Sequence, residues 1–329
     1  MNNAGPAIAT KIFQRGTLPV FKAAGTSKHE LAQWIKLSLY FECPAIKRGR
    51  LFLDFAPLWP EHYMTGILAV GFGLHATLIA KYRRYMKHEF LISAILGRQT
   101  YDHYSGSPVL NEYPYRHLSV ETIRSALGKF VGSIEQSYPA ALLQERQFGQ
   151  ASSIDSALQT VGDGVQITHP ADDKNSDRGE DNDDDDELDE RNDNNNHHEY
   201  DNNNLERPAA AAAAAAVGRH PTLRIKQCHS IELLKVDGAV VQMRIISDGL
   251  FSCRALVRDL GLELGCHAVI DQLHLKSIGP FGDEEALHKH ELHAVQIERA
   301  LTENAERSQK YFSRMKDQYP DATSTYRFI

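Results

Sequence analysis

A long acidic and asparagine-rich tract, followed by a run of alanines, separates the sequence into two blocks. Between Asp172 and Asp201 the chain carries 15 acidic and three basic side chains, and residues 209–216 are eight consecutive alanines. Such a segment has too few apolar side chains to offset the chain entropy lost on folding, which predicts disorder. An isolated octa-alanine helix is only marginally stable. We therefore expect residues 172–217 to be a disordered insertion in a single fold.

The acidic tract conceals the charge of the remaining chain. Asp172–Asp201 has a net charge of −12, whereas the whole chain of 329 residues has a net charge of −7. The remainder is therefore basic, with a net charge of +5. A basic surface suits a polyanionic partner such as a nucleic acid.

Cysteine spacing and hydropathy argue against a zinc-binding, a disulfide-rich and a membrane-spanning protein. The four cysteines are widely spaced and include no CxxC pair, so neither a zinc site nor a dense disulfide framework is indicated, and a reducing compartment is the default. The most apolar stretch, residues 66–80, is interrupted by glycines and His75 and is too short to span a bilayer. We predict no membrane partner.

The N-terminal residues 1–19 are basic. Lys11, Arg15, Lys22 and Lys28 precede the first acidic residue, Glu30, and no long apolar run accompanies them. This pattern resembles a mitochondrial presequence, and it equally fits an ordinary basic terminus. We expect the mitochondrial matrix as the location, with the nucleus or cytoplasm as the alternative.

Local patterns predict a mixture of helices and strands. Ser27 and Glu30 have the spacing of a capping box, and Asp237-Gly238 has the sequence of a hairpin turn. Apolar periodicity predicts helices over residues 28–41, 74–86, 119–131 and 254–264, and strands over residues 90–97, 223–234, 239–246 and 268–275. Because strands and helices do not alternate regularly, we expect an α+β fold with a mostly antiparallel sheet.

Several short motifs, in this order along the chain, resemble those of the TruB family of RNA pseudouridine synthases. They are Phe21–Ser27 (FKAAGTS), Thr65–Gly73 (TGILAVGFG), Lys87–Gly97 with Thr100 and Asp102, Phe130–Gln136 (FVGSIEQ), Arg254–Gly261 (RALVRDLG) and Ile278–Phe281 (IGPF). The resemblance covers about residues 20–137 and 222–290, and its long spacing is most similar to the animal mitochondrial branch. It implies a pseudouridine-synthase catalytic fold, split into residues 20–171 and 218–300, with a C-terminal tail at 301–329.

The resemblance also implies a site without metal or cofactor, into which one uridine of a folded RNA is flipped. Glu61 stands five residues before Gly66, where the family has its aspartate, and the extra methylene displaces the carboxylate. A displacement of about 1 Å can cost about 100-fold in rate. The only other nearby carboxylate, Asp54, lies seven residues too early and is expected in a loop.

Two further positions complete the implied site. Phe90 replaces the stacking tyrosine, so a ring face remains without the hydroxyl; the alternative is a core phenylalanine on a buried strand. Arg254 is retained and is positioned to pair with Glu61. The alternative for Arg254 is an exposed helix arginine, because its spacing from Arg258 suits exposure of both.

Basic residues near aromatic ones are candidate RNA contacts, since cations neutralise phosphates and aromatic rings stack on bases. The candidates are Lys22, Lys47, Arg48, Arg50, Arg83, Arg84 and Lys87. The alternative for the run at 81–87 is a solvated helix face. A metal site at His288, His290 and His293 is disfavoured, because of these only His290 and His293 approach a ligand spacing, and a polar helix face explains them.

Two function classes follow. One is an RNA pseudouridine synthase with a degenerate catalytic site, in which the replacement of aspartate by Glu61 leaves activity open. The other is a catalytically inactive RNA-binding or ribosome-assembly protein on the same fold, with mitochondrial RNA-processing or ribosome-assembly proteins as partners. A third hypothesis, an acidic loop that binds basic partners, rests on Asp172–Asp201 alone. The target, whether tRNA, mRNA or rRNA, is not specified by the sequence.

Deletion of residues 172–217 tests the insertion directly. We expect the shortened chain to be soluble and to unfold at the same temperature as the full chain, because the insertion contributes no core. Circular dichroism during heating measures this. A deletion variant that is insoluble or already melted would contradict the assignment of this tract as a mere insertion.

Overall fold

The computed structural model describes residues 13–43, 46, 51–58, 60–137 and 223–322. The α+β class predicted from the sequence is confirmed, and both sequence blocks contribute strands to the same sheet. The predicted insertion at 172–217 lies outside the described residues, as do Lys47, Arg48 and Arg50.

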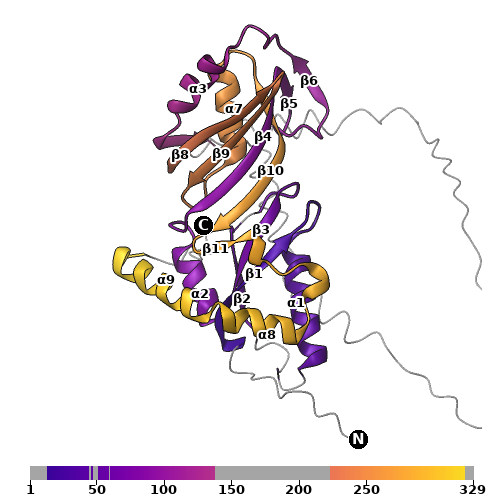
Figure 1. Cartoon of the computed structure of the whole chain (residues 1–329), viewed down its shortest axis with the longest axis vertical. Helices are drawn as coiled ribbons and strands as arrows, with labels where there is room; N and C mark the ends of the chain where they lie inside the picture. The colour runs from indigo at the N-terminus through magenta and orange to yellow at the C-terminus, as the bar shows by residue number, and fades with distance from the viewer. Residues whose placement is uncertain (1–12, 44–45, 47–50, 59, 138–222, 323–329) are drawn as a thin grey trace, which may run out of the picture. The chain divides into compact units, whose positions relative to one another are not determined.

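The sheet is mixed and mostly antiparallel (Figure 1). Its strands follow the order β1-β3-β10-β4-β9-β8-β7, and within this order only β3 and β10 are parallel. The strands of this path are β1 (Arg15–Lys22), β3 (Thr65–Gly73), β10 (Ala268–Ile278), β4 (His88–Leu96), β9 (Val240–Ser247), β8 (Leu223–Asp237) and β7 (Gly132–Ser137). The chain also forms β2 (Leu53–Ala56) beside β3, β11 (Phe281–Gly282) beside β10, and a separate hairpin of β5 (Arg98–Thr100) and β6 (Val109–Glu112).

The parallel pairing of β3 with β10 requires a glycine at the start of β3. Gly66 has a φ of +109°, and a Cβ atom there would lie 2.1 Å from the carbonyl oxygen of Leu275 on β10. Leu275 is the register partner of Gly66 in the parallel pair. Only glycine permits this approach, and it fixes where the loop before β3 meets the rest of the sheet.

The helices pack at two ends of the sheet. At one end, α2 (Leu74–Tyr82) contacts β1, β2 and β3 (Figure 1). At the other end, α3 (Val120–Gly128) contacts β8, α7 (Cys253–Glu263) contacts β7 and β10, and the two helices contact each other.

The predicted capping box at Ser27 is confirmed at the start of α1 (Lys28–Glu42). Among the described residues, none of the helices combines the length and hydrophobicity that crossing a bilayer demands.

Several predicted boundaries differ from the structure. The helix predicted over 74–86 ends at Tyr82, because the chain then turns, with the Tyr85 N–H donating to the carbonyl of Tyr82, and begins β4 at His88. The strand predicted to begin at residue 90 therefore begins two residues earlier. The assigned boundary at residue 19 falls inside β1, which pairs with β3 along its whole length.

The segment assigned as a C-terminal tail forms ordered helices as far as it is described. These are α8 (Ala294–Glu303) and α9 (Ala305–Gln318), and both contact β1. Phe312 of α9 is buried, and its ring meets the ring of His75 at 5.4 Å between centroids. Residues 301–318 therefore belong to the folded domain.

Two buried histidines, His75 and His88, and the half-buried His103 should make the fold sensitive to mild acid. Burial lowers the pKa of His75, His88 and His103 to about 4 in each case. The unfolded chain takes up these protons near pH 6.5, whereas the folded chain resists them until about pH 4. The free energy of unfolding should therefore fall as the pH drops through this window, by on the order of 2–3 kcal/mol for a fully buried histidine.

We expect His88→Leu to reduce this pH dependence, because it removes the most deeply buried of these rings from titration. Denaturant unfolding at about pH 7 and about pH 4.5 measures the difference. His117→Leu, at an exposed position, is the matched control and should retain the wild-type pH dependence. An unchanged pH dependence in His88→Leu would show that His88 does not contribute.

Candidate functional site

The candidate site is centred on an ion pair between Glu61 and Arg254. Glu61 lies in the loop between β2 and β3, and Arg254 is the second residue of α7. One guanidinium nitrogen of Arg254 bonds a carboxylate oxygen of Glu61, and the two side chains are 2% and 19% exposed. The pairing expected from the sequence is therefore present, and the alternative of an exposed helix arginine is wrong, because the Arg254 side chain is buried.

Gln136 fixes the start of the helix that carries Arg254. Its side-chain amide donates to the carbonyl of Ser252 at 2.9 Å and accepts from the Ser252 N–H at 3.0 Å. Ser252 in turn caps α7 by accepting from the N–H of Ala255. The FVGSIEQ motif thus acts through its last residue, which holds α7 at the point where Arg254 enters the site.

Lys22 anchors the loop immediately after Glu61. Its buried Nζ donates to the carbonyls of His62 at 3.0 Å and Met64 at 2.6 Å, and the Gly25 N–H also donates to the His62 carbonyl. Burial lowers the pKa of Lys22 to about 8, against an opposing effect from the nearby Glu61 charge. Lys22 therefore faces the protein interior, and its predicted contact with RNA is corrected to a positioning contact.

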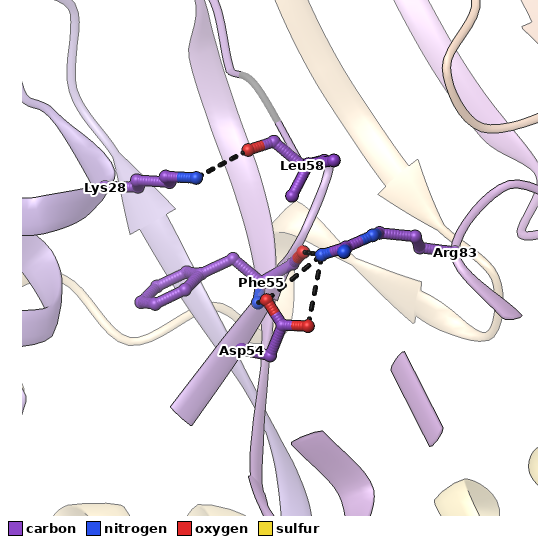
Figure 2. Close-up of polar contacts among 5 residues, drawn as sticks. All are labelled: Lys28, Asp54, Phe55, Leu58 and Arg83. Atoms are coloured by element: carbon purple, nitrogen blue, oxygen red, sulfur yellow. Dashed lines mark hydrogen bonds and ion pairs between the residues drawn. The ribbon is translucent and has the colours of Figure 1, made fainter. Parts of the chain in front are cut away.

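A second set of contacts anchors the beginning of this loop, as Figure 2 shows. Arg83 donates to both carboxylate oxygens of Asp54, at 3.0 and 3.1 Å, and these two side chains are 1% and 6% exposed. Lys28 donates to the carbonyl of Leu58 at 2.8 Å. Asp54 lies in β2 rather than in the expected loop. Arg83, predicted to contact RNA, is instead buried against Asp54.

The aromatic side chain beside the ion pair is Tyr63. The Arg254 guanidinium lies over the Tyr63 ring, 5.5 Å from its centroid. Tyr63 also stacks on Tyr104, with 4.1 Å between centroids and 9° between the ring planes. Burial raises the pKa of Tyr63 well above its usual value. The sequence offered one signal for Tyr63, its place two residues after Glu61, and none for its pairing with Tyr104.

Phe90 occupies the hydrophobic core. It is 5% exposed, and the edge of the neighbouring His88 ring meets it at 5.8 Å. In the sheet it pairs with Leu275, which pairs with Gly66, so Phe90 lies two strands away from the base of the Glu61 loop. This arrangement matches the core alternative that the sequence left open.

Two of the predicted RNA contacts are exposed. Arg84 and Lys87 lie in the turn between α2 and β4. Within this turn Arg84 is 5.8 Å from the centroid of the Tyr85 ring, and Tyr85 stacks on Tyr319 at 4.1 Å. The run at 81–87 therefore contains a buried arginine, two exposed cations and the half-buried ring of Tyr85.

The histidines considered for a metal have other contacts. His288 stacks on Phe21 at 4.5 Å, and His293 bonds Glu42 at 3.2 Å. His290 lies in a short 3-10 turn, Lys289–Glu291, which precedes α8. In the part of the chain that the structure describes, no three His, Cys, Asp or Glu side chains are grouped so as to hold a metal ion.

Comparison with known proteins identifies the fold. No protein-family model and no curated protein matches this chain. The structure of the archaeal box H/ACA sRNP Nop10–Cbf5 complex matches with a TM-score of 0.51 and 15% identity, over 93% of this chain and 68% of that chain. The chain has a Cbf5-like fold.

Two further solved structures match with similar TM-scores and sequence identities. A Cbf5–Nop10–Gar1 complex matches with a TM-score of 0.49 and 16% identity over 93% of this chain, which spans 60% of the matched chain. An H/ACA RNP bound to a substrate RNA containing 2′-deoxyuridine matches with a TM-score of 0.48 and 15% identity, over 88% of this chain and 58% of that chain. The match to the Nop10–Cbf5 complex agrees with the mixed α+β fold class expected from the sequence.

The Asp54–Arg83 pair gives a stability prediction. Arg83→Met should lower the free energy of unfolding by about 3–5 kcal/mol, because it leaves a buried carboxylate without its cation. The double variant Asp54→Leu/Arg83→Met should recover most of this loss, since it removes both charges. Chemical denaturation measures each value.

The exposed Lys129–Glu263 pair supplies the control for this experiment. Lys129→Met should cost no more than about 1 kcal/mol. An Arg83→Met variant that is as stable as the wild type would show that the buried pair does not hold β2 and the Glu61 loop.

Proposed function

We propose that this protein is an RNA pseudouridine synthase that isomerises one uridine of a folded RNA. The observation that carries the proposal is the ion pair between the buried Arg254 and Glu61, on a chain with a Cbf5-like fold. The structural neighbour is part of a ribonucleoprotein, which supports RNA as the partner. The proposal requires no cofactor, because the reaction is an isomerisation.

The chemistry assigned to the site needs a positioned carboxylate. The reaction breaks the bond between N1 of uracil and C1′ of ribose and joins C5 to C1′. C5 releases its proton and N1 takes up a proton from solvent, so that no atom is gained or lost overall. We assign the carboxylate role to Glu61. Arg254 orients one carboxylate oxygen, and Lys22 and Lys28 hold the backbone on either side. These contacts limit the freedom of a side chain that is one methylene longer than aspartate.

We assign the RNA-facing surface to exposed cations. Arg84 lies beside the Tyr85 ring, which stacks on Tyr319, and Lys87 lies in the same turn. Such a combination suits phosphates and unpaired bases. Lys47, Arg48 and Arg50 remain predicted contacts from the sequence. The basic charge of the chain outside Asp172–Asp201 supports this assignment.

We also propose a mitochondrial location, with RNA-processing or ribosome-assembly proteins as partners. The support is the basic N-terminal sequence and the similarity of the motifs to the animal mitochondrial branch. Because β1 begins at Arg15, a presequence that leaves the sheet intact would end before that residue. Fluorescence microscopy of the full chain tagged at its C-terminus tests the location.

A second candidate function is RNA binding without the reaction. The burial of Phe90 in the core favours it, because the ring at this position is the one that the family resemblance assigns to base stacking. The presence of Glu61 in place of aspartate favours it as well. The two functions differ in whether the C5 proton is released.

Tritium release separates the two functions. Cells that lack the protein supply RNA labelled with 5-tritiated uridine, and pseudouridine formation transfers the label to water. We expect release by the wild-type chain and a loss of about 10²–10⁴-fold in Glu61→Gln. Glutamine keeps a hydrogen-bonding partner for the buried Arg254 guanidinium that alanine would remove, so this variant is preferable to alanine.

Two further variants complete this experiment. Glu303→Gln breaks an exposed Glu–Arg pair on α8 and should release tritium as the wild type does. No release by the wild type, with RNA binding intact, would establish the second function. Release by Glu61→Asp alone would mean that the extra methylene of Glu61 abolished an ancestral activity.

A further inference from the structure

Tyr104 stacks on Tyr63, whose ring lies beside the Glu61–Arg254 pair. Its ring is parallel to that of Tyr63, with 9° between the planes and 4.1 Å between the centroids, and both residues are partly buried. Tyr63 is also the ring beneath the Arg254 guanidinium. Parallel rings at this separation have the geometry with which a nucleobase stacks on an aromatic side chain.

The backbone around Tyr104 is held on both sides. The Ile270 N–H on β10 donates to the His103 carbonyl at 2.9 Å, and the Ser105 N–H donates to the Ile270 carbonyl at 2.7 Å. Asp102 accepts from the Tyr104 N–H at 3.1 Å. The ring can therefore leave Tyr63 only by rotation of the side chain, while the backbone stays in place.

Neighbouring residues also accommodate the stack. Gly106 leaves space for the ring, because a Cβ atom there would lie 2.6 Å from Tyr104 Cε1. His103 adopts a φ of 60°, a left-handed conformation that is uncommon outside glycine. The loop thus places the Tyr104 ring on Tyr63 through a backbone geometry that ordinary side chains rarely adopt.

We propose that Tyr104 occupies, in the RNA-free protein, the place that the flipped uracil takes on Tyr63. This inference rests on the proposed function, and it assigns the base-stacking ring to Tyr63 instead of the buried Phe90. A phenol ring and uracil are both planar six-membered rings, so either one fills the space beside Tyr63. The entering base displaces Tyr104, and the site is covered until RNA binds.

Displacement of Tyr104 lowers the apparent affinity for RNA, because the stack between Tyr63 and Tyr104 is lost when the base enters. Tyr104→Ala removes this competition and should tighten binding of a uridine-containing RNA by about 2- to 10-fold. Tyr63→Leu removes the stacking surface and should weaken binding. Tyr101→Ala, at an exposed position in the same loop, should leave the affinity unchanged.

The experiment uses the full chain and a short RNA hairpin with a single 4-thiouridine in its loop. Fluorescence anisotropy measures affinity, and irradiation followed by mass spectrometry of the peptides locates the crosslink. We expect the wild-type crosslink at Tyr63 or Tyr104, and a stronger crosslink at Tyr63 in Tyr104→Ala. Tyr63→Phe keeps the ring and should crosslink as the wild type does. If Tyr63→Leu fails to fold, the crosslinks of the wild type, Tyr63→Phe and Tyr104→Ala still test whether the base stacks on the ring at position 63.

The outcomes separate this inference from the proposed function. Crosslinks at Phe90 or elsewhere, with an affinity that Tyr104→Ala leaves unchanged or weakens, would overturn the role of Tyr104 and leave RNA binding intact. If the wild type and Tyr104→Ala bind no RNA at all, the proposed function fails and this inference fails with it.

Discussion

The buried guanidinium of Arg254 is the constraint on which the candidate site depends. Removing a charge from water costs several kcal/mol unless a partner and hydrogen bonds compensate, and Glu61 is the carboxylate that pairs with it. The pair joins α7, from the second sequence block, to the loop before β3, from the first. Gln136 and Gly66 keep these two elements in register, since one fixes the start of α7 and the other lets β3 approach β10.

Basic residues in this chain serve the interior as well as the surface. Lys22, Lys28 and Arg83 direct their charges at backbone carbonyls or at Asp54, and together they hold both ends of the Glu61 loop. A positive net charge therefore overstates the charge available to RNA. The exposed Arg84, adjacent to Arg83, shows that neighbouring arginines can have opposite roles, one inside the fold and one at its surface.

Sequence reasoning succeeded where the signal was local. The capping box at Ser27 and the hairpin predicted at Asp237-Gly238 depend on residues a few positions apart. The structure has both, with the hairpin turn at Gly238 and Ala239, because Asp237 still pairs with Val240. It failed where burial depends on distant residues, as for Lys22 and Arg83, and it missed the Tyr63–Tyr104 stack, which joins residues far apart in sequence. Helix α9 was missed because its many charges conceal the spacing of Phe312 and Met315. The pairing of Arg254 with Glu61 was predicted because the motifs supplied the long-range alignment.

A map of pseudouridine in RNA from cells that lack the protein, rescued with the wild-type chain or with Glu61→Gln, tests the central claim most directly. The account predicts at least one uridine whose conversion to pseudouridine is restored by the wild type and not by a Glu61→Gln chain that is folded and present at the same level. That position would also identify the substrate. A map that is identical in all strains, together with equal rescue of growth by both chains, would contradict the assignment of Glu61 to catalysis and leave an RNA-binding protein.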